Sequence, residues 1–244
     1  MTTNKIALVT GANKGIGLET VKQLARQGMT VLLGARDTKK GEAAAEKLRE
    51  EKLDVQFLEI DVNDTASIRK AAGKVEREFG LLDILINNAG VMADDEKKKA
   101  SEQTLETWRK TFETNLFGVV ATTQAFLPLL RKSVAGRIVN LSSILGSITY
   151  HATPGSPVYD SKGYTSYNVS KSAVNAWTVQ LAYELQDTKI KVNAAHPGWV
   201  KTDMGGKGAT MEIPDGARTS VELATLEEGG PNGAYIHMGE VLPW

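Results

Sequence analysis

Short runs of Val, Ile and Leu alternate with longer stretches of helical periodicity between residue 5 and about residue 197. Because these runs are apolar almost without interruption, they indicate strands that are covered on both faces, as in a parallel sheet. Strands are expected at 5–10, 30–35, 55–61, 82–87, 137–142 and 191–197, and helices at 16–27, 39–51, 64–79, 102–131 and 168–186. Alternation with right-handed crossovers predicts an α/β fold, a doubly wound parallel sheet of about seven strands with helices on both faces. No linker or repeat interrupts the pattern, so a single domain is expected over 1–244.

Composition excludes several classes of protein. The chain has no cysteine, so it cannot carry a disulfide framework. Its 29 Lys and Arg balance 29 Asp and Glu, which argues against nucleic acid or an anionic membrane as a partner. No apolar run reaches the roughly 18–20 residues of a membrane span, and the start lacks the apolar stretch of a signal peptide. We therefore expect a cytoplasmic protein with a small-molecule partner and, without Cys or His-Glu-x-x-His, no metal site.

Two segments break the alternation. Residues 144–166 and 198–233 are rich in Gly, Pro and hydroxyl side chains, with one short helical stretch near 215–226. Both follow a strand, and ligands of open α/β sheets bind beyond the carboxyl ends of the strands. We expect these irregular segments to cover a substrate site. The charged run at 94–99 is interpreted as a solvated loop.

A glycine-rich turn joins the first strand to the first helix. Gly11 permits a tight turn, while Gly15 and Gly17 let a pyrophosphate approach the unpaired N–H groups at the start of the helix. The position of this turn in a βαβ unit favours a dinucleotide, and the absence of Gly-Lys-Ser/Thr argues against a nucleoside triphosphate site. The residues of the turn expected at the cofactor are Gly11, Asn13, Lys14, Gly15, Ile16 and Gly17.

The end of the second strand indicates which nicotinamide cofactor binds. NAD sites usually place an Asp or Glu here, bonded to the adenosine 2′-hydroxyl. In this chain Arg36 occupies that neighbourhood, and Lys14 can reach the same point from the glycine turn. Two cations suit a 2′-phosphate, so NADP(H) is predicted. The neighbouring acid, Asp37, is expected to point away.

A set of motifs that spans nearly the whole chain resembles the short-chain dehydrogenase/reductase family, which implies a Rossmann fold. The motifs are TGANKGIG (10–17), Asp61-Val62, NNAG (87–90), Asn115, LSS (141–143), Tyr167-Asn-Val-Ser-Lys171 and Pro197-Gly198-Trp-Val-Lys-Thr202. Within the family, the stretches NKGIGLE, ARDTKKGEAA, HPGWVKTDMGG and GPNGAYI and the residue Trp244 are most similar to the NADPH-dependent carbonyl reductases.

Tyr167 and Lys171 lie four residues apart at the expected start of a helix, so they share one face. A nearby ammonium favours the phenolate and is expected to move the pKa of Tyr167 from near 10 toward neutrality. Tyr167 would then protonate a carbonyl oxygen that Ser143 holds by a hydrogen bond. Tyr159, Tyr164 and Ser142 compete for these roles, but neither tyrosine has Lys four residues later. Both tyrosines are interpreted as pocket or surface residues.

Further assignments rest on the resemblance. It implies that Lys171 binds the nicotinamide ribose and that Asn115 supports a water chain to this lysine. Asp61 and Val62 would contact the adenine, and Asn88 the ribose beside it. The remaining cofactor positions implied by the matching motifs are Gly90, Tyr167, Pro197, Gly198, Val200 and Thr202, of which Val200 and Thr202 would hold the carboxamide. Asn87 is expected to be structural.

The chain departs from the family's pattern in two places. Ser143 and Tyr167 lie 24 residues apart instead of 13, and the extra residues fall in 144–166. Because an insertion here can cover the family's assembly face, the sequence leaves a monomer, a dimer and a tetramer open. His196 replaces the usual Asn before Pro-Gly and is expected to be structural.

These observations predict an NADPH-dependent carbonyl reductase that converts ketones or aldehydes to alcohols. A non-catalytic NADP(H) sensor on the same fold is an alternative, although such a sensor would lose Tyr167 or Lys171. A second alternative is reduction of the C=C bond of an enone, which the same hydride geometry could serve.

Overall fold

The computed structural model describes residues 5–244, so the first four residues of the predicted single domain lie outside the described part. One eight-stranded sheet forms its centre, in the order β3-β2-β1-β4-β5-β6-β7-β8. All neighbouring strands are parallel except β7 and β8, which form an antiparallel pair. The strands are β1 (Ile6–Val9), β2 (Thr30–Ala35), β3 (Val55–Glu59), β4 (Ile84–Asn87), β5 (Arg137–Leu141), β6 (Lys191–Ala195), β7 (Tyr235–His237) and β8 (Glu240–Val241). The predicted doubly wound fold is confirmed, with the first six strands at the expected places.

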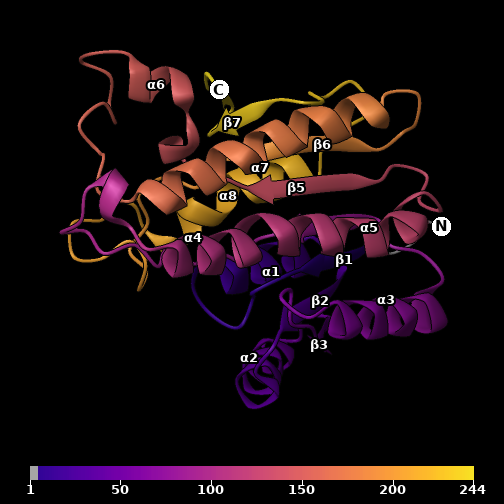
Figure 1. Ribbon diagram of the computed structural model, residues 1–244. Helices are drawn as coiled ribbons and strands as arrows, with labels where there is room; N and C mark the ends of the chain where they lie inside the picture. Colours follow the sequence, from indigo (N-terminus) through magenta and orange to yellow (C-terminus); the bar gives the residue numbers. More distant parts are fainter. Residues whose placement is uncertain (1–4) are drawn as a thin grey trace.

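Helices cover both faces of this sheet (Figure 1). They are α1 (Gly15–Arg26), α2 (Thr38–Glu50), α3 (Thr65–Phe79), α4 (Leu105–Phe112), α5 (Gly118–Leu130), α6 (Ile148–Ala152), α7 (Thr165–Glu184) and α8 (Ile213–Ala224). The helix expected over 102–131 is divided, because a π-helical turn at Glu113–Phe117 separates α4 from α5. The segment 144–166 is less irregular than expected, since it contains a 3₁₀ turn at Ile144–Gly146 and the short helix α6.

Alternate residues of the first six strands enter two separate cores. In β1, Ala7 and Val9 pack with α1, α2 and α8, whereas Ile6 and Leu8 pack with α3, α5 and α7. Side chains alternate between the faces of a strand, so a strand covered on both faces is apolar at most positions. This burial explains the continuous apolar runs of the sequence.

The order in which successive strands are added reverses between β1 and β4, which are parallel neighbours in the middle of the sheet. From β1 the chain winds outward to β3 on one side, and from β4 it winds to β8 on the other. Such a reversal opens a crevice beyond the carboxyl ends of the two strands. No helix of the described residues is long and apolar enough to cross a membrane.

Candidate active site

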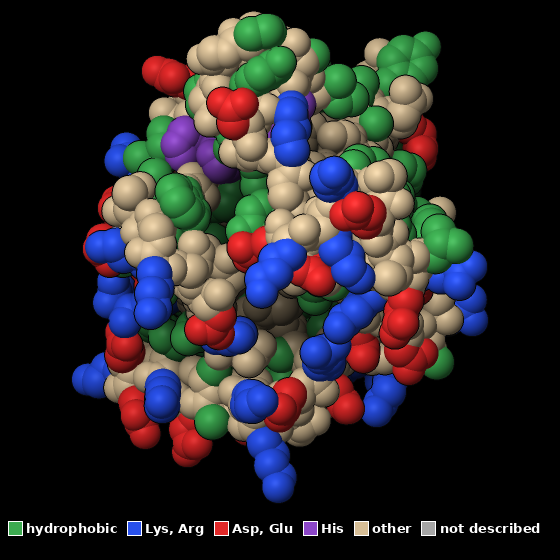
Figure 2. Space-filling model, turned by 60° about the vertical axis from the view of Figure 1, so that its left-hand side comes forward, with side chains coloured by type: hydrophobic (Ala, Val, Ile, Leu, Met, Phe, Trp, Pro, Cys, Tyr) green, Lys and Arg blue, Asp and Glu red, His purple; other side chains and the backbone are tan. Residues whose placement is uncertain are grey.

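A cavity of about 1030 Å³ lies at the carboxyl ends of the strands, around the reversal point. These ends face the left of Figure 1, and Figure 2 shows this side of the molecule hollowed near its middle, with basic side chains beside the hollow. The predicted site residues that line the cavity are Gly11, Asn13, Lys14, Gly15, Ile16, Gly17, Arg36, Asp61, Val62, Asn88, Gly90, Tyr167, Lys171, Pro197 and Thr202. Four others, Asn115, Ser143, Gly198 and Val200, do not line it. The structure thus gathers most of the predicted positions in one place.

The glycine turn is closely packed against the end of β4. Gly11 adopts a φ of +64°, a conformation that favours glycine. A Cβ atom at Gly17 would lie 2.4 Å from Asn88 Nδ2, so only glycine fits there. Asn88 Nδ2 donates to the carbonyl oxygens of Thr10 (2.8 Å) and Gly11 (3.2 Å). Asn88 therefore holds the turn itself, in addition to lining the cavity where the resemblance places the ribose.

The start of α1 has the properties of an anion site. Lys14 precedes the helix in an extended conformation, and its side chain makes no capping bond to the first-turn N–H groups. Gly15 has a φ of +58°, and a Cβ atom there would meet nothing nearer than Thr202 Cγ2 at 3.5 Å. Uncapped N–H groups and the helix dipole both favour negative charge at this point. These residues fit a bound pyrophosphate.

Arg36, Asp61 and Val62 border the part of the cavity where the resemblance places the adenine. Asp37 does not belong to the lining, because it caps α2: its Oδ1 accepts from the N–H of Lys40 at 3.0 Å. This contact agrees with the expectation that Asp37 points away. Among the cavity residues, Lys14 and Arg36 are the cations that border the region from the glycine turn to the end of β2.

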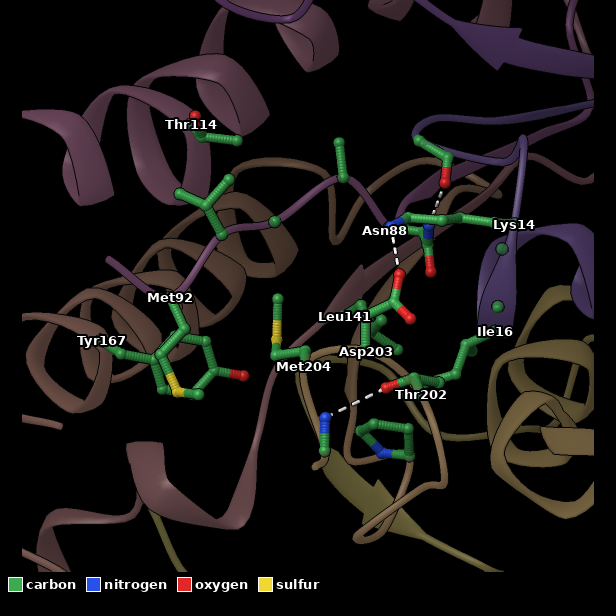
Figure 3. A pocket seen from close by; sticks show the side chains of 18 of the residues that line it. Lys14, Ile16, Asn88, Met92, Thr114, Leu141, Tyr167, Thr202, Asp203 and Met204 are labelled. Atoms are coloured by element: carbon green, nitrogen blue, oxygen red, sulfur yellow. Dashed lines mark hydrogen bonds and ion pairs between the residues drawn. The ribbon is translucent and has the colours of Figure 1, made fainter. Parts of the chain in front are cut away.

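Tyr167 and Lys171 lie in the first turns of α7, and both side chains are buried. Lys171 Nζ is 5.6 Å from the centroid of the Tyr167 ring and donates to the Leu141 carbonyl oxygen at 2.7 Å. Ser143, at the end of β5, forms a side-chain hydrogen bond that lowers the pKa of the Tyr167 phenol. In Figure 3 the Tyr167 ring extends into the cavity, on the same side as Met92 and Met204.

The pKa of Tyr167 differs from the sequence expectation. Burial raises it to about 12, and the bond to Ser143 offsets only part of this rise. Burial also lowers the pKa of Lys171, from 10.5 to about 8. Desolvation disfavours the charged form of each group, and here it outweighs the attraction between ammonium and phenolate on which the expectation relied. The phenol therefore keeps its proton at neutral pH.

The competing residues have other roles. Ser142 Oγ donates to Asn175 Oδ1 at 2.6 Å, so its hydroxyl proton is engaged away from Tyr167. Tyr159 lies against Lys162, whose Nζ is 4.8 Å from the ring centroid. Tyr164 lines the cavity, as the interpretation of a pocket residue expected. Asn87 bonds Thr123 Oγ1 and Asn140 Oδ1 in the interior, which agrees with a structural role.

Asn115 lies in the π-helical turn and is fully buried. Its Oδ1 accepts from the Val91 N–H at 2.8 Å, and its Nδ2 donates to the Val91 carbonyl oxygen and to Ser170 Oγ, both at 2.9 Å. A Cβ atom at Gly90 would lie 3.5 Å from Asn115 Oδ1 and 3.7 Å from Lys171 Nζ. Asn115 thus lies close to the lysine while binding the segment that follows β4.

His196 joins the segment after β5 to the segment after β6. Its Nδ1 accepts from the N–H groups of Ile144 (3.2 Å) and Gly198 (3.3 Å). Burial and the adjacent His237 lower the pKa of His196 to about 3, so the ring is neutral. The structure agrees with a structural role, because the ring accepts two backbone hydrogen bonds and does not take up a proton near pH 7.

Asp203 lies in the segment 198–233 expected to cover the site; it lines the cavity, and its Oδ2 forms an ion pair with Lys14 Nζ at 2.5 Å. Glu96, from the run 94–99, also lines the cavity and was not indicated by any motif. The run 94–99 is a largely exposed loop, as predicted, but Asp94 is half-buried and bonds the first turn of α7. The position of Glu96 and Asp94 in the sequence could have indicated these roles, because the segment that follows β4 starts at the carboxyl end of the strand and must pass the crevice. No group of His, Cys, Asp and Glu within residues 5–244 is placed to hold a metal ion.

Comparison with known proteins agrees with this geometry. Residues 5–212 match the family described as short chain dehydrogenase. Carbonyl reductase (NADPH) 1 of Homo sapiens is 34% identical, over 98% of each chain. The (+)-neomenthol dehydrogenase of Capsicum annuum is 31% identical, also over 98% of each. The crystal structure of NADPH-bound carbonyl reductase from chicken fatty liver superimposes with a TM-score of 0.86, at 30% identity over 100% of both chains.

Proposed function

The chain belongs to the short-chain dehydrogenase/reductase family, and from this premise we propose that it is an NADPH-dependent carbonyl reductase. The family membership makes it an oxidoreductase that acts on C=O and CH–OH groups. The proposal adds the direction, reduction of a ketone or aldehyde to an alcohol, and the preferred cofactor. The relatives named as NADPH-dependent carbonyl reductases support both additions.

One observation carries the proposal: the buried phenol of Tyr167 lines the cavity with the Lys171 ammonium 5.6 Å from its ring centroid. Tyr167 has a pKa of about 12, so it retains a proton at neutral pH and can donate it to a carbonyl oxygen. Ser143, whose hydroxyl lowers the pKa of the phenol, would hold the same oxygen and stabilise the negative charge that develops on it. A sensor without catalytic activity would not need this arrangement.

Lys171 supports the donor from one helical turn away. Its ammonium lies near the Tyr167 ring and is fixed by the Leu141 carbonyl oxygen. As the proton leaves, the ammonium stabilises the phenolate that forms. We assign to Lys171 the second role that the resemblance implies, binding of the nicotinamide ribose. Asn115, bound to Ser170 and Val91 nearby, would support the supply of protons to this lysine.

The cofactor's contribution is the hydride that bound NADPH supplies to the carbonyl carbon. The chain's own residues would hold it by the N–H groups at the start of α1, by Asp61 and Val62 at the adenine, and by Thr202 at the opposite end. Lys14 and Arg36 would bind the 2′-phosphate, because two cations border this part of the cavity and the nearby acid Asp37 is engaged by α2. This charge distribution supports NADPH over NADH.

The substrate end of the cavity suits a small molecule with apolar surface. Met92, Met204 and Tyr164 are among its lining residues, and methionine side chains adapt to ligands of different shapes. Reduction of an enone C=C bond is the second candidate for the same site. The protonated phenol beside Ser143 favours C=O, because carbonyl reduction needs a proton on the oxygen, whereas reduction of an enone C=C bond ends with a proton on carbon.

A screen of NADPH oxidation tests the proposal. Purified protein would be offered ketones, aldehydes, quinones and enones with NADPH and, in parallel, with NADH, and the products would be identified as alcohols or saturated ketones. We expect alcohols, formed preferentially with NADPH. Saturated ketones as the sole products would favour enone reduction. Tight NADPH binding without turnover of any compound would favour the sensor.

A further inference from the structure

We infer that Asp94 is a positioning residue for Tyr167: its carboxylate fixes the first turn of α7 and thereby the place of the phenol. The inference rests on the proposed function and assigns it a residue that no motif indicated. Asp94 lies on the segment between β4 and α4, and it does not line the cavity. Its action on the reaction would therefore pass through Tyr167.

The contact consists of three hydrogen bonds to two consecutive residues. Asp94 Oδ1 accepts from the Ser166 N–H at 2.7 Å. Asp94 Oδ2 accepts from the Ser166 hydroxyl at 2.8 Å and from the Tyr167 N–H at 3.1 Å. The carboxylate thus uses both oxygens and reaches the backbone of the proposed proton donor directly. Hydrogen bonds to a charged acceptor are stronger than those between neutral groups.

The helix has no such support from its own sequence. Tyr164, at the N-cap position of α7, makes no side-chain capping bond, and the first turn contains no acidic residue. Unpaired N–H groups at a helix start need an acceptor, and a negative charge there is favoured by the helix dipole. Asp94, 72 positions before Ser166 in the chain, supplies both the acceptor and the negative charge. The start of the catalytic helix is therefore set by a tertiary contact.

The same segment reaches Tyr167 by a second route. The Asn115 amide binds the N–H and the carbonyl oxygen of Val91 and donates to Ser170 Oγ. Ser170 Oγ in turn donates to the Tyr167 carbonyl oxygen at 2.7 Å. The segment 91–94 thus contacts the N–H group of Tyr167 through Asp94 and its carbonyl group through Asn115. Loss of Asp94 would leave the second contact and the bond between Thr111 Oγ1 and Ser166 Oγ at 2.9 Å.

Freeing the first turn would change the position of the phenol relative to Ser143. A displacement of about 1 Å in a reacting group can lower a rate by about 100-fold. The cofactor turn, around Gly11 and Lys14, would be unaffected, because Asp94 makes no contact with it. The expected result is a loss in kcat without a loss in NADPH affinity.

The experiment compares Asp94→Asn and Asp94→Ala with Asp64→Asn. Asp64 is the matched control because it caps another helix, α3, through the Ala66 N–H at 2.8 Å and lies outside the cavity lining. We expect kcat to fall about 10-fold in Asp94→Asn and about 100-fold in Asp94→Ala, in the range for a misplaced group. The Kd for NADPH should stay within about twofold in all three variants, and Asp64→Asn should keep its kcat. If the Asp94 variants lose thermal stability as Asp64→Asn does but retain kcat, the inference is wrong.

Amide hydrogen exchange gives a readout that does not depend on activity. Asp94→Ala should accelerate exchange at the Ser166 and Tyr167 N–H groups by at least about 10-fold, and Asp64→Asn should leave them unchanged. Unchanged exchange in Asp94→Ala would overturn the inference, even if the wild-type protein reduced no carbonyl compound. An active wild type with accelerated exchange but full kcat in Asp94→Ala would overturn it while leaving the proposed function intact.

Discussion

Lys14 in the glycine turn and Asp203 in the segment after β6 form an ion pair across the cavity, with 2.5 Å between Nζ and Oδ2 (Figure 3). Both side chains are largely exposed, so the pair contributes little to stability. The pair matters for ligand binding, because it gives Lys14 a negatively charged partner. A 2′-phosphate bound to this lysine would compete with the Asp203 carboxylate, and the two negative groups would repel each other.

Asp203→Asn should therefore strengthen NADPH binding. We expect the KM for NADPH to fall about two- to fivefold, the range for an exposed ion pair. The KM for NADH should change less, because NADH has no 2′-phosphate. Steady-state kinetics at low and at 0.5 M salt would check this, with Glu76→Gln as the control, since it breaks the exposed Lys132–Glu76 pair instead. Equal changes for both cofactors would contradict the prediction.

Arg36→Asp should reverse the cofactor preference. The substitution removes a guanidinium from the cavity lining and places a carboxylate near the expected 2′-phosphate. Loss of a charged hydrogen bond of about 1.5–3 kcal/mol corresponds to about 10- to 100-fold in kcat/KM for NADPH. Arg131→Asp is a suitable control, because Arg131 pairs with Glu184 and lies outside the lining. An unchanged ratio of kcat/KM for the two cofactors would exclude Arg36 from phosphate binding.

Tyr167→Phe should abolish most of the turnover by removing the proton donor. General acid catalysis contributes about 10²–10⁴-fold, so kcat should fall by that factor. The Kd for NADPH, measured by fluorescence, should remain nearly unchanged. Tyr159→Phe should keep its activity, because Tyr159 lies outside the cavity lining, against Lys162. Substantial residual turnover in Tyr167→Phe would assign the proton donor elsewhere.

Lys171→Met should inactivate the protein and yet stabilise it at pH 7. Burial lowers the pKa of Lys171 from 10.5 to about 8, so the folded state disfavours the ammonium, by at most about 3 kcal/mol. Between about pH 8 and 10.5 the unfolded chain binds a proton that the folded chain does not. In the wild type this lysine therefore makes the free energy of unfolding rise with pH across that window.

Denaturant unfolding at several pH values would measure this effect. The difference in stability between Lys171→Met and the wild type should be greatest below pH 8 and should shrink toward pH 10.5. Tyr167 titrates from its raised pKa in both proteins, so to first order its contribution cancels in this difference. A difference that does not vary with pH would show that the ammonium of Lys171 is not disfavoured by folding.

The first six strands and the glycine turn could be predicted because their signals are local. A strand buried on both faces is apolar throughout, and Gly11 and Gly17 occupy positions that no other residue fits. The motif around Tyr167 was equally local, since a spacing of four residues is one helical turn. No periodic pattern indicated the π-helical turn that divides the helix over 102–131, or the 3₁₀ turn and α6 within 144–166.

Local sequence thus determined the first six strands, the glycine turn and the spacing that places Tyr167 and Lys171 one helical turn apart. Only the tertiary structure decided that the pKa of the Tyr167 phenol is raised. The rise comes from burial, which no short motif encodes. The tertiary structure also decided that Asp94 caps α7 and that Asp203 pairs with Lys14. These partners lie 72 and 189 positions from the residues they bind, and only the folded sheet brings the carboxyl ends of its strands together.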